Sequence, residues 1–65
     1  MVKADVGHVV RWGETIMLIV DRVNTDNGEK WKCLVLVTGP GWDFAYPPGA
    51  IGYFRDVDFT ARLAP

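Results

Sequence analysis

Residues 15–37 read TIMLIVDRVNTDNGEKWKCLVLV, and this stretch decides the fold. Both of its ends are rich in Ile, Val and Leu, residues that favour β-strands. Its middle is polar and closes with Asn27-Gly28, a pair that adopts positive φ angles at low cost and marks a hairpin turn. We therefore predict an antiparallel hairpin with strands at 15–23 and 30–37, the second beginning at Glu29 or Lys30.

Shorter segments on both sides of the hairpin continue the pattern. No stretch repeats apolar residues at the spacing of a helix over three turns. We expect one all-β domain, residues 1–65, folded as a small five-stranded barrel that is closed or half-open. Its remaining parts are predicted as a strand at 8–12, a Gly- and Pro-rich loop at 39–49, a strand at 50–54, a 3-10 turn at 55–58 and a last strand at 59–63.

Two segments resemble known small barrels. Val6-Gly7-His8-Val9-Val10-Arg11 resembles the opening strand of KOW and other SH3-like barrels, although His8 stands where an acidic residue is more usual. Residues 49–54, the turn after them and residues 59–63 are similar to the closing Gly-x-Ile segment, 3-10 turn and last strand of SH3-like domains. Together they cover about a third of the chain. The resemblance implies an SH3-like barrel and no particular activity.

The composition argues against several classes of protein. The chain has 65 residues, of which 49% are hydrophobic, and its 7 Lys and Arg against 8 Asp and Glu give a net charge of −1. Disorder is disfavoured by the apolar fraction, and non-specific DNA binding by the lack of excess basic residues. One cysteine and one histidine leave no disulfide framework and no usual four-ligand zinc site. We expect neither a metal nor another cofactor.

No combination of residues predicts catalysis. His8 is the only histidine, and no nucleophile motif accompanies it. Cys33 lies in an apolar strand, where a thiol is usually inert. Asp56 and Asp58 are two residues apart around a turn, which we expect them to cap. The chain is therefore not expected to be an enzyme.

Export and membrane insertion are not predicted either. The longest uncharged apolar run, Ile16 to Val20, has five residues, far fewer than the roughly 20 that cross a bilayer. The first residues contain no apolar signal segment, and a free thiol at Cys33 is typical of a reducing compartment. We expect a cytoplasmic protein without a membrane partner. Its small size resembles that of accessory proteins of bacteriophages or bacteria.

The hairpin carries more apolar residues than one small core can hold. A hairpin with one solvated face alternates apolar with polar residues, whereas both strands here are apolar on both faces. A second apolar face is therefore predicted, and the sequence does not fix the register. This face carries one of two complementary sets, of which we name Met17, Ile19, Leu34 and Leu36.

Two explanations for this second face stay open. The loop at 39–49 folds back and covers it with Trp42, Phe44 and Tyr46, or the face is an interface with a second copy or another protein. The same three aromatic residues, held on a loop rich in Gly and Pro, are expected first to cover a small core. The alternatives are that they bind a partner or, less favoured, stack on nucleic-acid bases.

We therefore expect a non-enzymatic protein–protein interaction module that self-associates through the hairpin. One alternative is a barrel that binds nucleic acid, a function that the charge balance disfavours. Another is a structural component of a larger assembly, such as a phage particle. The candidate residues for nucleic-acid binding are Trp12, Arg22, Lys30 and Lys32.

Overall fold

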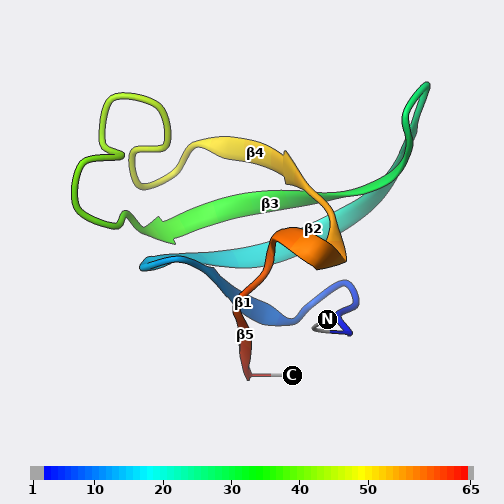
Figure 1. Ribbon diagram of the computed structural model, residues 1–65, viewed down its shortest axis with the longest axis horizontal. Coiled ribbons are helices and arrows are strands. Elements are labelled where there is room, and N and C mark those ends of the chain that lie inside the picture. The colour runs from blue at the N-terminus through cyan, green and yellow to red at the C-terminus, as the bar shows by residue number, and fades with distance from the viewer. Residues whose placement is uncertain (1–2, 65) are drawn as a thin grey trace.

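A computed structural model describes residues 3–64 as one antiparallel sheet with a single turn of 3-10 helix (Figure 1). The elements are β1 (Val9–Trp12), β2 (Thr15–Thr25), β3 (Gly28–Val37), β4 (Ile51–Phe54), η1 (Asp56–Asp58) and β5 (Ala61–Ala64). The strand order is β4-β3-β2-β1-β5, so β4 and β5 are the edges of the sheet. The predicted all-β fold with five strands and one 3-10 turn is confirmed. In the described part of the chain, no helix has the length and apolar character to cross a membrane.

The turn between β2 and β3 is tighter than the sequence suggested. Asp26 and Asn27 connect the two strands, and Thr25 pairs directly with Gly28. The Thr25 hydroxyl closes the turn by donating to the Gly28 carbonyl (2.7 Å) and accepting from the Asn27 N–H (3.2 Å). Of the Asn-Gly pair only Gly28 has a positive φ, +105°. Strand β2 is therefore two residues longer than predicted, ending at Thr25 instead of Val23.

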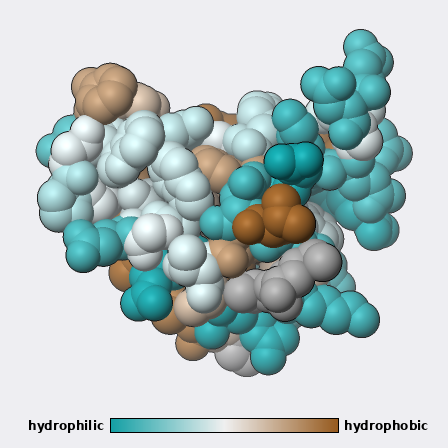
Figure 2. All heavy atoms as spheres, in the orientation of Figure 1, coloured by the Kyte–Doolittle hydropathy of each residue, from teal (hydrophilic) through white to brown (hydrophobic). Residues whose placement is uncertain are grey.

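Two β-bulges interrupt the pairing of β2 with β3. The first leaves Leu36 of β3 without a partner in β2, and the second leaves Val20 of β2 without a partner in β3. A bulge bends its strand and increases the local twist. Beyond the second bulge the hairpin leaves the body of the sheet as a projecting ribbon (Figure 1), and the surface there is hydrophilic (Figure 2).

The core lies on one side of the sheet, which we call the inner face. Trp12, Trp31 and Tyr46 pack against it from the margins. Phe59, which precedes β5, packs against Phe54 of β4 with ring centroids 6.4 Å apart and so links the two edge strands. The buried hydrophobic residues are Val10, Met17, Ile19, Cys33, Val35, Phe54 and Phe59.

The register corrects one assignment made from the sequence. Residues directly opposite each other on neighbouring strands share a face, and Met17 and Ile19 lie opposite buried residues of β3. Both are therefore core residues, whereas Leu34 and Leu36 lie on the other side of the sheet. The prediction that all four share the second face is wrong for Met17 and Ile19.

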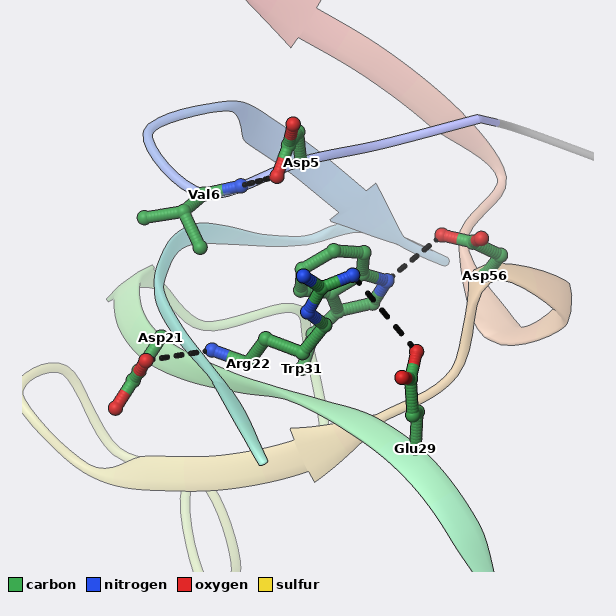
Figure 3. A network of polar contacts seen from close by, with 7 residues as sticks. All are labelled: Asp5, Val6, Asp21, Arg22, Glu29, Trp31 and Asp56. Atoms are coloured by element: carbon green, nitrogen blue, oxygen red, sulfur yellow. Dashed lines mark hydrogen bonds and ion pairs between the residues drawn. The ribbon is translucent and has the colours of Figure 1, made fainter. Parts of the chain in front are cut away.

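The 3-10 turn is fixed by its own carboxylates and by β3. Asp58 Oδ2 accepts the Arg55 N–H at 2.9 Å, which caps the turn as predicted for this residue. Asp56 Oδ1 accepts the indole N–H of Trp31 at 2.8 Å (Figure 3). The second bond connects η1 to β3, and together the two bonds hold the link between the edge strands in place.

Candidate functional site

The side of the sheet opposite the core, which we call the outer face, carries a row of aliphatic residues. The cross-strand partners Val9, Leu18, Leu34 and Ile51 follow one another across β1, β2, β3 and β4. Side chains directly opposite each other on an antiparallel pair lie in contact. The row therefore crosses four strands without a charged residue, and its end member, Ile51, is 44% exposed.

Further apolar residues widen this row. Ile16 and Val37 are paired next to it, and Leu36 at the bulge is 42% exposed. On the other side of the row, Tyr53 of β4 is opposite Lys32 of β3 and is itself exposed. The centre of the outer face is consequently apolar across the width of the sheet.

Charged residues lie at the margins of the outer face. Arg11 is paired with Ile16, and Asp21 is paired with Lys32. The outer face therefore has basic and acidic groups around an aliphatic centre. Protein interfaces have the same arrangement, with an apolar core and a polar rim.

The loop between β3 and β4 does not cover the outer face. The ring centroids of Trp42 and Tyr46 lie 5.0 and 5.4 Å from that of Trp12, and Tyr46 lies 5.5 Å from Phe54. Trp12 and Phe54 alternate with residues of the outer face along their own strands, so they belong to the inner face. The first of the two explanations for the second apolar face is therefore not what the structure contains.

Phe44 occupies a separate position on this loop. It is 84% exposed and stacks on Trp42, with ring centroids 6.0 Å apart and planes 18° apart. Figure 2 shows apolar side chains projecting at the corner where this loop lies in Figure 1. Of the predicted aromatic loop patch, the structure keeps Trp42 and Phe44 accessible and places Tyr46, which is half-buried, against the core.

Of the residues named for nucleic-acid binding, the structure brings together only Arg22 and Lys30. Trp12 lies at the end of β1 among the loop aromatics. Lys30 and Lys32 alternate with Trp31 along β3, whereas Arg22 is paired with Trp31. A pocket of about 80 Å³ is lined by Arg22 and Lys30, together with Glu29, Trp31 and Asp56.

The carboxylates of that pocket are engaged within the chain. Glu29 lies 3.9 Å from the Arg22 guanidinium, and Asp56 accepts the Trp31 indole N–H (Figure 3). Basic and acidic groups thus offset each other there, and no continuous basic stripe forms along the hairpin.

The surroundings of His8 and Cys33 are those of structural residues and not of a reactive site. His8 Nδ1 accepts the Asp5 N–H at 2.9 Å, within a local turn. Burial raises the pKa of the Cys33 thiol from 9.0 to about 12, which keeps it protonated and unreactive at neutral pH. Among residues 3–64, no group of three or more His, Cys, Asp or Glu side chains is arranged to hold a metal ion.

Comparisons of this chain with protein-family models, curated proteins and solved structures found no match. The outer face therefore has to be interpreted from its own geometry. Val9 and Ile51 were not among the predicted interface residues, because the row becomes visible only once the register joins four strands. Leu18 belongs to the complementary set that the sequence left open.

Proposed function

We propose that this chain is a non-enzymatic protein-interaction module that binds a second copy of itself through the outer face of the sheet. The observation that carries the proposal is the aliphatic row of Val9, Leu18, Leu34 and Ile51, together with Leu36 beside it. Ile51 and Leu36 are exposed, and the other three residues are half-buried. Large exposed apolar patches on a folded chain mark interaction sites.

The size of the chain favours association. A domain of about 60 residues buries only roughly 60% of the surface of its unfolded chain. Many small domains gain stability from disulfides, metals or oligomerisation, and Cys33 of this chain is free. A typical interface takes about 800 Å² from each partner, which is about one fifth of the 4160 Å² of this chain's surface.

The charges around the outer face support a second copy as the partner. A two-fold symmetric interface brings the same patch of both chains together, so a margin of one sign would repel its twin. Asp21 supplies a negative group, whereas Arg11 and Lys32 supply positive ones. The margins of two copies can therefore face each other without the repulsion that charges of a single sign would cause.

Light scattering at micromolar concentration tests this proposal. We expect a mass of about 15 kDa, twice the 7.3 kDa of one chain. Leu34→Asp and Leu36→Asp place a carboxylate in the interface and should return the chain to the monomer mass, because an unpaired buried charge is costly. Circular dichroism checks that both variants stay folded.

The matched control is Val57→Asp, which makes the same kind of change at an exposed residue of η1. It should leave the mass of the wild type unchanged. A wild type that stays monomeric at every concentration, or a dimer that both outer-face variants retain, would exclude the proposal.

A further inference from the structure

A groove lies at the opposite end of the molecule from the hairpin tip, between the β1–β2 turn and the loop that follows β3. It has a volume of about 340 Å³. We call it the Trp12–Trp42 groove. It is lined by Trp12, Gly13, Glu14, Gly39, Pro40 and Trp42.

The two indoles of the groove pack against each other at a tilt. Their ring centroids are 5.0 Å apart and their planes are tilted by 53°. Trp12 also packs against Phe54, with ring centroids 5.2 Å apart. Trp42 is 43% exposed, and Phe44 extends its aromatic surface outward. A planar group entering the groove would therefore meet aromatic surface.

The walls of the groove are held in place before any ligand arrives. Gly39 is buried and donates its N–H to the hydroxyl of buried Thr15 at 3.0 Å. A Cβ on Gly39 would approach the backbone and side chain of Glu14 to 3.1 Å, so the loop lies directly against the β1–β2 turn. The Trp42 carbonyl accepts from the N–H groups of Ala45 and Tyr46, which fixes the loop itself. A preformed site loses little conformational entropy on binding.

The charge of the groove selects a cation. Glu14 is its one charged lining residue, and Asp43 follows Trp42 in the chain. Within residues 3–64 the Glu14 carboxylate makes no ion pair, since the one such pair joins Arg22 to Glu29. Indole faces attract cations, and a carboxylate beside them repels phosphate groups. Nucleic acid is therefore disfavoured as the occupant.

We infer that the Trp12–Trp42 groove binds an arginine side chain from an extended segment of a partner protein. A guanidinium is planar, stacks on an indole and donates two parallel hydrogen bonds to a carboxylate. The two indoles supply the stacking surface and Glu14 supplies the carboxylate. This site is distinct from the outer face, so it does not depend on self-association.

The test is a titration with a capped Gly-Gly-Arg-Gly-Gly peptide, followed by NMR through the indole N–H signals of the tryptophans. We expect saturable shifts at Trp12 and Trp42 in the millimolar range, with Trp31 unaffected because its N–H is bonded to Asp56. The same peptide with citrulline for arginine keeps the shape and loses the charge. It should bind about fivefold more weakly or not at all.

Two variants separate the groove from the rest of the surface. Glu14→Gln should weaken the arginine peptide about fivefold and leave the citrulline peptide unchanged. Glu29→Gln, at the carboxylate that faces Arg22, should change neither. Both variants should keep the mass measured for the wild type, because neither residue lies on the outer face.

Three results would overturn the inference. They are the absence of any shift at millimolar peptide, equal affinity for the arginine and citrulline peptides, and shifts confined to residues outside the groove. If the wild type proves monomeric while these shifts are observed, the proposed self-association fails and the groove stands.

Discussion

The two faces of this sheet are built from the same kinds of residue and have different surroundings. On the inner face, Met17 and Val35 are at most 1% exposed. On the outer face, Leu36 and Ile51 are more than 40% exposed, although they are just as apolar. The phenylalanines before and after η1 close the inner side, whereas the outer row is only half-buried in its middle and exposed at Ile51. Hydrophobicity therefore marks both faces, and only the tertiary contacts tell the core from the surface.

The largest expected difference between the faces is the effect of a substitution on the free energy of unfolding. Met17→Ala should lower the free energy of unfolding by about 2–5 kcal/mol, because it leaves a cavity in a closed core. For a chain of this size the total is roughly 3–10 kcal/mol, so this variant comes close to unfolding. Leu36→Ala should cost no more than about 1 kcal/mol. Urea denaturation at low protein concentration measures both.

Low concentration keeps association out of that comparison. If Leu36→Ala cost as much as Met17→Ala in the monomer, the outer face would be part of the core and the distinction between the faces would fail.

Adjacent residues of β4 give a second comparison. A Cβ on Gly52, which points to the inner face, would lie 2.5 Å from Phe54 Cε2 and 3.0 Å from Tyr46 Cε1. Gly52→Ala should therefore destabilise the chain by about 1–3 kcal/mol through overpacking. Tyr53→Thr, one residue along on the outer face, keeps a residue that favours strands and should change stability by about 0.5 kcal/mol.

Thermal unfolding of the two variants measures this contrast. A Gly52→Ala variant as stable as the wild type would mean that the Tyr46 ring does not pack on β4, and the loop would then be free to cover another surface.

A smaller effect is expected from the thiol on the inner face. Burial raises the pKa of Cys33 from 9.0 to about 12. Between these values the unfolded chain loses the thiol proton while the folded chain keeps it, so stability falls as the pH rises. The contribution is fully present below pH 9 and should shrink by roughly 1 kcal/mol between pH 9 and 10.

The matched variant for this effect is Cys33→Ala, which has no thiol. Its stability relative to the wild type should improve by the same amount over that pH interval, in urea denaturation at each pH. A difference between the two proteins that does not change with pH would show that the Cys33 thiolate is tolerated in the folded state.

Much of the fold followed from local patterns in the sequence. Alternating β-branched residues and glycine punctuation predicted each strand to within about two residues, since strand type and turn position are encoded over a few neighbours. The 3-10 turn at Asp56 followed in the same way. The second apolar face was also predicted, because it required only a comparison of the number of apolar residues with the size of the core.

The register and the position of the loop were not predictable in this way. The extra residues Val20 and Leu36 at the bulges leave no mark in a strand that is apolar on both sides, so Met17 and Ile19 were assigned to the wrong face. The contact between Trp12 and Trp42 joins residues distant in the chain, and the Trp12–Trp42 groove exists only because the loop folds against the β1–β2 turn. Local patterns do not encode such contacts.

The central claim is that the outer face is where two copies meet, and isotope-filtered NMR of a mixture of labelled and unlabelled chains tests it most directly. We expect intermolecular contacts from the methyl groups of Leu34 and Leu36 to outer-face residues of the other copy. The absence of intermolecular contacts at high concentration, or contacts confined to Val57 and Leu63, would contradict it.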